Sequence, residues 1–559
     1  MTHKIWLLLA SLVLLPAAIS FRILSYSPQF SPSHVKFIGN IADFLVQAGH
    51  NVYASVIFTP PSKEAAKTFG DRQFRKLMWD KNFGFLAMLQ KGESMKQAFT
   101  TTCEKVLLQK KLLETLKNEK FDLLITELFD VCAFGALSIV AVNDQLTSPS
   151  KNISNFECQI SNFNYNNRLV EVLEIPAHII TSASALMDNV ASFVGVPLFF
   201  SSAAAFYTTF ESANTTVAPF ADRMTYKERF INFLMTQGFV YYFGSVVSAE
   251  EKLFKKFYGQ NFPSLYVRLL LSKFDIIAQS TFVLTNGEPL IEYPRPITQK
   301  VIEIAGLSHP QVKPLDEVWE KVLTARDRAV LVSFGTNVES CDMPQKVKKI
   351  FLDLFSSFPD VTFIWKYEAD DLPLDKYKNL VTAKWLPQND ILGHKNLVAF
   401  VTHGGINSIV ETISIGKPMV VVPIFADQFR NGKMIQRYGT GLVVSKQEML
   451  DEDRLFQALK EILSNNRYSK KAERLAKMIR KKPMSSKELL IKHVEFAAEF
   501  GRIPLWDPVG RTMPFYQFYL LDIIIPLILV LLLLSVAILF CLYKVTRKLL
   551  CAEKKVKSE

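Results

Sequence analysis

Cysteine is scarce in this chain of 559 residues, and its six cysteines lie far apart. The sequence contains no CxxC pair and no cluster of cysteine with histidine, which excludes common zinc sites and a disulfide-rich scaffold. It also lacks a GxGxxG motif and a Walker lysine, the usual signs of dinucleotide and ATP binding. Asp451-Glu452-Asp453 has the spelling of a metal-binding acidic pair, but it precedes a helical pattern, where acidic side chains favour the helix start. We therefore expect no metal and no cofactor in the chemistry.

The chain also lacks a basic stripe of the kind that binds nucleic acid. Its net charge is +12, with 65 Lys and Arg against 53 Asp and Glu. The positive residues are not interleaved with aromatic side chains, so we predict no nucleic-acid partner. Part of the excess lies in residues 544–559, which hold six Lys or Arg and two Glu. The length of the chain indicates two or more domains, because a single core seldom grows so large.

Long apolar runs are present at both ends of the chain. A lysine, an apolar run and then small residues make residues 1–20 typical of a signal peptide. Residues 523–543 are uncharged and mostly apolar, long enough for one helix to span a bilayer, and residues 501–522 form the juxtamembrane segment. The basic tail at 544–559 favours the cytosolic side. The sequence therefore predicts a single-pass membrane protein whose bulk is lumenal or extracellular.

Short motifs agree with passage through the secretory pathway. Lys555 and Lys557 resemble a dilysine-type retrieval signal of endoplasmic-reticulum membrane proteins, although a solvated charged tail is the alternative interpretation. Asn152 and Asn214 each begin a glycosylation sequon. We therefore expect an endoplasmic-reticulum membrane glycoprotein with a lumenal bulk and a cytosolic tail.

The first part of the mature chain alternates strand and helix patterns. Strands are predicted over Phe21–Tyr26, Val52–Phe58 and Phe121–Thr126, with a helix over Val35–Ala48 between the first two. Such alternation indicates an α/β domain with a parallel sheet, and we place this domain at 21–290.

The middle of the chain departs from this alternation. Residues 143–167 are rich in Asn and Ser and are predicted to form an exposed loop. Residues 170–275 are rich in Phe, Leu and Ala and carry helical patterns, a composition that suggests a site for small lipophilic molecules. Residues 285–316 carry five prolines and are predicted to form an interdomain linker.

A second α/β unit is predicted over 291–500. Its strand patterns are Val330–Phe334, Val361–Trp365, Leu397–Val401 and Met419–Ile424. Residues 451–500 look helical and charged, and they could pack back across both domains. Because ligands of parallel sheets bind at strand carboxyl ends, two such domains would place a site in the cleft between them.

The most informative stretch runs from Trp385 to Gln428. The strand pattern 397–401 ends in His403-Gly404-Gly405, and a helix pattern follows in which Ser408 and Glu411 are spaced as a capping box. A strand, a glycine turn and a helix N-terminus together make an anion site from backbone N–H groups and the helix dipole.

The types and spacing of these residues resemble the nucleotide-sugar signature of the UDP-glycosyltransferases, specifically an invertebrate-like member of the membrane-bound UDP-glucuronosyltransferases. The resemblance implies the GT-B-type fold, with two facing Rossmann-like domains, here followed by one C-terminal transmembrane helix. It also implies a UDP-sugar co-substrate, a small lipophilic acceptor, a role in detoxification and self-association in the membrane.

Carried over position by position, the resemblance implies a donor-binding role for thirteen residues. Trp385 would stack on uracil, and Gln388 would bind a ribose hydroxyl or the base. Glu411 would accept from the ribose hydroxyls, and Asp427 and Gln428 would hold sugar hydroxyls. The diphosphate would meet His403, the backbone of Gly404, Gly405 and Asn407, and the helix start that includes Ser408. A second strand-to-loop turn, with Ser333, Gly335 and Thr336, could also approach the diphosphate.

The resemblance also implies a catalytic base at His34, in the loop that enters the first helix. We expect the helix N-terminus to keep this histidine neutral. The family orients its base with an Asp, whereas the aligned residue here is Glu127, with Asp130 as the fallback partner. Its longer side chain could still reach His34.

The predicted function is inverting transfer of glucuronate from UDP-glucuronate to an acceptor hydroxyl, with His34 as general base. One alternative is the same chemistry with UDP-glucose as donor. An alternative of another class is a non-catalytic single-pass binding protein, which Glu127 in place of Asp would favour.

Overall fold

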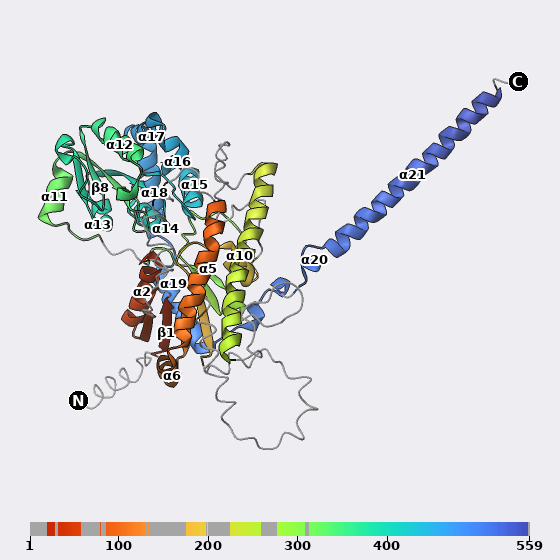
Figure 1. Ribbon diagram of the computed structural model, residues 1–559, viewed down its shortest axis with the longest axis horizontal. Helices are drawn as coiled ribbons and strands as arrows, with labels where there is room; N and C mark the ends of the chain where they lie inside the picture. Colours follow the sequence, from red (N-terminus) through yellow and green to blue (C-terminus); the bar gives the residue numbers. More distant parts are fainter. Residues whose placement is uncertain are drawn as a thin grey trace, which may run out of the picture. The chain divides into compact units, whose positions relative to one another are not determined.

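The structure is a computed structural model, shown as a ribbon in Figure 1. It describes residues 20–27, 32–56, 76, 79, 85–128, 132, 175–196, 198, 224–258, 277–307, 312–511 and 513–556. Several predictions fall outside these residues: the signal peptide up to residue 19, the sequons at Asn152 and Asn214, the loop at 143–167, and Asp130.

The first sheet is six-stranded and parallel throughout, with the order β2-β1-β3-β4-β5-β6. Its strands are β1 (Arg22–Ser27), β2 (Asn51–Val56), β3 (Leu123–Glu127), β4 (Ala177–Ser182), β5 (Phe282–Thr285) and β6 (Val301–Glu303). The described helices between them are α2 (Pro32–Gln47), α5 (Phe85–Leu107), α6 (Lys110–Asn118), α9 (Asp188–Phe193) and α10 (Tyr226–Tyr258). Strands β1, β3 and β4, in the middle of this sheet, are almost entirely buried, which explains their continuous apolar patterns.

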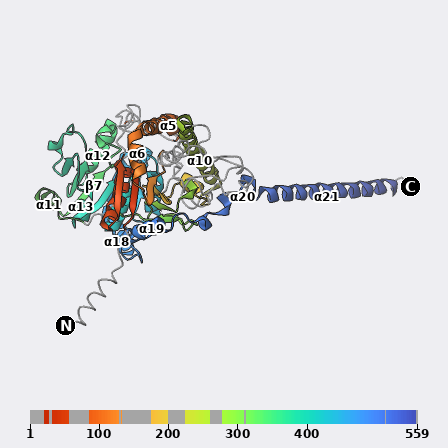
Figure 2. The ribbon, with the colours of Figure 1, turned by 90° about the horizontal axis from the view of Figure 1, so that it is seen from below.

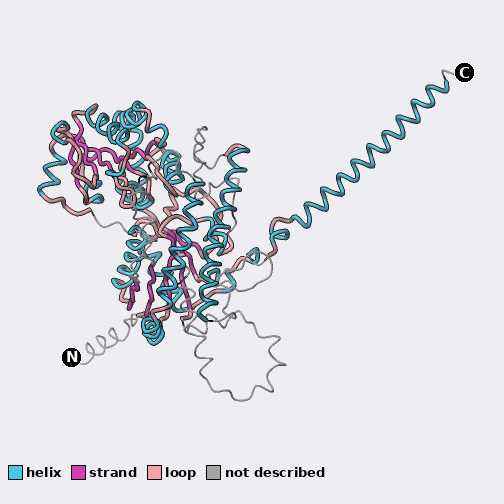
Figure 3. Tube along the Cα trace, in the orientation of Figure 1, coloured by secondary structure: helices cyan, strands magenta, loops and turns pink. Residues whose placement is uncertain are grey.

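The second sheet is also six-stranded and parallel, with the order β12-β11-β10-β7-β8-β9. Figure 3 colours the strands magenta and the helices cyan. Its strands are β7 (Arg328–Ser333), β8 (Val361–Lys366), β9 (Leu380–Ala383), β10 (Leu397–Thr402), β11 (Met419–Val421) and β12 (Gly441–Val443). Its helices are α11 (Glu317–Thr324), α12 (Gln345–Ser356), α13 (Gln388–Gly393), α14 (Ile406–Ile415), α15 (Gln428–Tyr438), α16 (Lys446–Met449), α17 (Glu452–Ser464) and α18 (Arg467–Arg480). The predicted pair of Rossmann-like halves is confirmed.

The passage between the two sheets differs from the prediction. Because β6 still belongs to the first sheet, the boundary placed at residue 290 and part of the linker placed at 285–316 lie within the first half. The chain returns to the first half in α19 (Ser486–Phe500), whose Leu490 and Val494 pack in the core beneath that sheet. Helix α18 instead packs its Leu475 with the second sheet, so the helices of 451–500 do cross both halves.

Two described helices are long and apolar enough to cross a membrane. In α21 (Leu521–Val556) the candidate span is Leu521–Lys548, with a mean hydropathy of 3.3 and exposed apolar side chains. It contains the predicted span 523–543 and follows the short helix α20 (Phe515–Phe518). The other helix, α10, packs many of its side chains in the core, as expected of a core helix. Helices α5 and α10 run side by side in both ribbon views (Figure 1, Figure 2).

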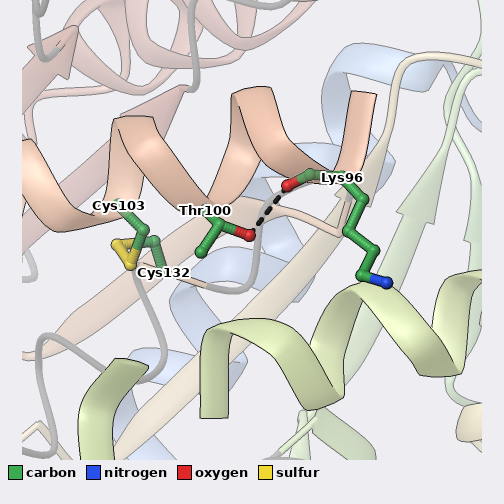
Figure 4. The surroundings of a disulfide bond; sticks show 4 residues. All are labelled: Lys96, Thr100, Cys103 and Cys132. Atoms are coloured by element: carbon green, nitrogen blue, oxygen red, sulfur yellow. Dashed lines mark hydrogen bonds between the residues drawn. A yellow bond between two sulfur atoms is a disulfide. The ribbon is translucent and has the colours of Figure 1, made fainter. Parts of the chain in front are cut away.

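One disulfide joins α5 to the segment that follows β3. Cys103 on α5 bonds Cys132, 29 residues further along the chain (Figure 4). Both cysteines are fully buried in the core that α5, α9 and α10 share. The pairing was not predicted from the scattered cysteines. A disulfide fits an oxidising compartment, in line with the secretory route that the sequence indicates.

Candidate active site

The carboxyl ends of β1, β3, β4 and β5 place chemistry-bearing groups along one edge of the first sheet. His34 is the third residue of α2, which follows β1, and Glu127 is the last residue of β3. Because β1 and β3 are neighbouring parallel strands, residues 93 positions apart meet there. The side chain of Glu127 therefore does reach His34.

The contact between His34 and Glu127 is short and buried. His34 Nδ1 lies 2.7 Å from Oε1 of Glu127, whose side chain is fully buried. The same Oε1 accepts a hydrogen bond from the backbone N–H of Ala183 at 2.9 Å. A carboxylate at this distance holds the proton of a neutral imidazole on Nδ1, which leaves Nε2 as the basic nitrogen.

The electrostatics of His34 differ from the expectation. Burial acts to lower the pKa of His34, but the Glu127 carboxylate and its hydrogen bond outweigh burial, so the pKa is raised. The expectation that the helix N-terminus keeps His34 neutral did not include the Glu127 carboxylate, which acts in the opposite direction. A smaller raising contribution comes from Asp427, a predicted donor-sugar residue of the second half. The charge of Asp427, predicted to bind the donor sugar, thus acts on His34, predicted to be the base, across the two halves.

The end of β10 forms a tight glycine turn around His403. A Cβ at Gly405 would lie 2.6 Å from Nε2 of His403, and a Cβ at Gly335, after β7, would lie 2.7 Å from its Cε1. Only glycine leaves room for the ring at these two positions. The two turns predicted to hold the diphosphate, 333–336 and 403–405, therefore meet at His403.

His403 is neutral in this turn. Burial, and next the positive charge of Lys366 at the end of β8, lower the pKa of His403 to about 4, against a smaller opposing hydrogen bond with the Ser333 backbone. A neutral ring can donate one N–H but carries no full charge. Lys366 was not singled out in the sequence. It is a buried cation paired with Glu368 at 2.6 Å.

Helix α14 begins earlier than predicted. Gly405 is its N-cap, so Ser408 lies within the first turn and the capping box with Glu411 does not form. Instead, the Gln388 side-chain amide donates to Glu411 at 2.7 Å and contacts the Ser408 hydroxyl at 3.4 Å. Gln388, Ser408 and Glu411, all predicted to bind the UDP-sugar, thus form one polar cluster. Nearby, Trp385 is 73% exposed, which leaves an indole face open for stacking.

The start of α15 is held by its own side chains. The buried Gln428 accepts hydrogen bonds from the backbone of Ile424 and Phe425, at 2.8 and 3.0 Å. Asp427 accepts from Asn431 at 2.7 Å, and Asn431 also donates to the Gly404 carbonyl at 3.0 Å. Burial raises the pKa of Asp427 despite the bond from Asn431. Asn431 thus joins the loop of Asp427 and the turn of Gly404 into one hydrogen-bonded unit. Thr336 is exposed at the site's edge.

A buried ion pair ties this unit to the first half. Arg430 on α15 makes two bonds to Glu292, at 3.2 and 2.5 Å, and its guanidinium lies over the Tyr293 ring. Arg430 and Glu292 are 4% and 8% exposed. Sequence reasoning missed both residues, since only the folded chain pairs positions 138 residues apart.

Two groups of acidic side chains have the composition of a metal site. Asp451 is the N-cap of α17 and accepts from the Asp453 backbone N–H, so its role at the helix start is confirmed. Within the described residues, Glu339, Cys341 and Asp342 bring three ligand-type atoms within 4.8 Å of one another. Burial and the nearby carboxylates raise the pKa of Cys341 to about 11, which keeps the thiol protonated and a poor ligand.

Two facing parallel sheets with these turns define a glycosyltransferase of the GT-B type. Solved structures share the fold: the glycosyltransferase of kitacinnamycin, at 14% identity and a TM-score of 0.51, covers 88% of this chain and 100% of that one. Os79 from O. sativa in complex with UDP, at 16% identity and a TM-score of 0.50, covers 86% and 99%. The model of the family described as UDP-glucoronosyl and UDP-glucosyl transferase matches residues 187–556, and the chain belongs to that family.

Relatives extend the similarity along the chain. The Caenorhabditis elegans protein ugt-46 is 28% identical over 580 aligned residues, which cover 99% of each chain. UDP-glucuronosyltransferase 1A8 of Homo sapiens is 30% identical over 308 residues, 55% of each chain. The chain is therefore an enzyme of the UDP-glycosyltransferase class.

Proposed function

We propose that this enzyme transfers glucuronate from UDP-glucuronate, with inversion, to a hydroxyl of a small lipophilic acceptor. The observation that carries the proposal is the 2.7 Å contact of His34 with Glu127, beside Asp427 of the donor half. A histidine oriented by a buried carboxylate can act as a general base and take the proton of a hydroxyl.

The reaction is a single displacement. Nε2 of His34 takes the proton of the acceptor hydroxyl as its oxygen attacks the anomeric carbon, and Glu127 stabilises the imidazolium that forms. The bond from the anomeric carbon to the diphosphate breaks, and UDP leaves. The turns around His403 and the start of α14 stabilise the charge on the leaving diphosphate. An α-linked donor gives a β-linked product, and we propose that neither a metal nor a cofactor takes part.

The donor sugar rests on similarity alone. The human relative is named a glucuronosyltransferase, whereas the family description includes glucosyl transfer. UDP-glucose is therefore the second candidate. The non-catalytic alternative was favoured by Glu127 in place of Asp. Glu127 makes the contact with His34 that the family's Asp would make, so this argument no longer supports it.

For location, we propose a single-pass endoplasmic-reticulum membrane enzyme anchored by α21, with both sheets lumenal and the tail cytosolic. The apolar span Leu521–Lys548 and the disulfide Cys103–Cys132 support this proposal. Self-association is part of the same proposal and rests on the resemblance.

The test is UDP release from membranes that contain the full chain. UDP-glucuronate and UDP-glucose are supplied separately, with a panel of lipophilic phenols as acceptors, and His34→Ala is the matched variant. We expect acceptor-stimulated release with UDP-glucuronate and a loss of about 10²- to 10⁴-fold in His34→Ala. Full turnover by folded His34→Ala would refute the assigned base, and turnover with UDP-glucose alone would reassign the donor.

A further inference from the structure

A side-chain bridge connects the two halves at the site. Asn286 directly follows β5 and is 3% exposed. Its side-chain amide donates to the Ala183 carbonyl at 3.0 Å and to Oδ1 of Asn407, on α14 of the second half, at 2.7 Å. Both hydrogens of this amide are thus used, one on each half of the enzyme.

The bridge continues to the proposed base. The residue that accepts from Asn286 on the first half is Ala183, and the N–H of Ala183 donates to Oε1 of Glu127. The strands β3, β4 and β5 are neighbours in the sheet, so Glu127, Ala183 and Asn286 follow one another along its carboxyl edge. An ordered path of hydrogen bonds therefore runs from His34 to Asn407.

The position of Asn286 is set by its main chain. Its backbone N–H donates to the carbonyls of Ser182 and Ser184, at 2.9 and 3.0 Å. The Ala183 carbonyl can only accept a hydrogen bond, so the side-chain amide of Asn286 turns its NH2 group toward this carbonyl. It presents N–H groups, and not its oxygen, to Asn407.

This arrangement dictates which way the Asn407 amide faces. An asparagine amide can turn over, and its partners decide which end is oxygen and which is nitrogen. Because Oδ1 of Asn407 accepts from Asn286, the NH2 group of Asn407 is directed away from Asn286. Asn407 is the second residue of α14, where backbone N–H groups and the helix dipole favour an anion.

We propose that Asn286 is a positioning residue that orients the Asn407 amide so that its N–H groups meet the diphosphate of the UDP-sugar. Asn286 lies at the same edge of the sheet as Glu127 and His34. One hydrogen-bond network therefore positions both the UDP-sugar and the base. The inference rests on the proposed function insofar as the ligand is a nucleoside diphosphate. It adds a residue that does not touch the substrate.

The experiment is a double-mutant cycle on UDP binding, without sugar or acceptor. The full chain in detergent is titrated with UDP by calorimetry, as wild type, Asn286→Leu, Asn407→Ala and the double variant. Leucine matches asparagine in shape, carries no charge and cannot donate. Thermal unfolding of each variant shows whether it is folded, and Asn286→Ala replaces Asn286→Leu in the cycle if the latter does not fold.

We expect each single variant to bind UDP about tenfold more weakly, the loss of one hydrogen bond to a charged group. The double variant should be no weaker than the Asn407→Ala variant, since Asn286 acts only through Asn407. Unchanged UDP affinity in Asn286→Leu, or losses that multiply in the double variant, would overturn the inference.

The failure of this inference and that of the proposed function can be told apart. UDP affinity needs neither the sugar nor His34, so the cycle can be read even if the donor is misassigned. If the wild type binds UDP and the losses of the two single variants add up in the double variant, only the role of Asn286 is overturned. A wild-type chain that does not bind UDP overturns both.

Discussion

Oε1 of Glu127 is shared between Nδ1 of His34 and the N–H of Ala183, at 2.7 and 2.9 Å. A buried carboxylate so placed sets both the orientation and the pKa of the histidine. The longer side chain in place of the family's Asp is accommodated without loss of the contact.

Glu127→Gln should lower kcat about 10²-fold or more, because the amide no longer stabilises the imidazolium. His34 must be neutral to act, so activity falls as the pH drops through its raised pKa. Removing the carboxylate removes the main raising influence, and the acidic limb of the kcat/KM profile should move to lower pH. A pH–rate profile of both proteins measures the shift. An acidic limb at the same pH in both proteins would contradict the pairing of His34 with Glu127.

The raised pKa of His34 also makes the stability of the fold depend on pH. Because the folded pKa of His34 is raised, the pair stabilises the fold fully below the unfolded pKa of about 6.5 and loses this contribution as the pH rises through the folded value. Denaturant unfolding at a series of pH values, on the wild type and Glu127→Gln, should show a difference that shrinks toward alkaline pH.

Gly405→Ala should weaken donor binding, because the new Cβ would lie 2.6 Å from the His403 ring and push it out of place. A displacement of this kind can cost up to about 10²-fold in activity. Steady-state kinetics with varied UDP-sugar measure it. Gly39→Ala is the matched control: a Cβ there meets nothing within 4 Å on α2, and helix propensity predicts about 0.5 to 1 kcal/mol of added stability.

Arg430→Met should destabilise the enzyme by about 3 to 5 kcal/mol, because it leaves the buried Glu292 carboxylate without its partner. The double variant Arg430→Met, Glu292→Gln removes both charges and should recover part of the loss. Denaturant unfolding measures both. A double variant as unstable as the sum of the single variants would mean that the two side chains are not coupled.

Cys103→Ser should lower stability by about 2 to 4 kcal/mol, the usual effect of opening a loop of this size. The bond joins α5 to the chain after β3, five residues beyond Glu127, so activity should fall at temperatures where the wild type is still active. Thermal inactivation half-lives measure this effect. Cys341→Ser, at a free cysteine, is the control and should change stability by about 0.5 kcal/mol or less.

Parts of the site could be predicted because they are contiguous. The residues from Trp385 to Gln428 are close in the chain, so their spacing already indicates a nucleotide-sugar site. The error there was local: the first turn of α14 begins at Ile406, since Gly405 adopts the N-cap conformation that spacing alone assigned to Ser408. The upward pKa shift of His34 could not be predicted, because it depends on the distance to a carboxylate 93 residues away.

The alternating α/β pattern, the glycine turn before α14 and the apolar run of α21 could all be predicted from the residues. These features depend on periodicity and on neighbours within a few positions of the chain. The contacts of Asn286 with Asn407, Arg430 with Glu292 and Cys103 with Cys132 became known from the folded chain. Such contacts depend on which strands lie side by side and on where the two halves touch, and no local pattern encodes that pairing.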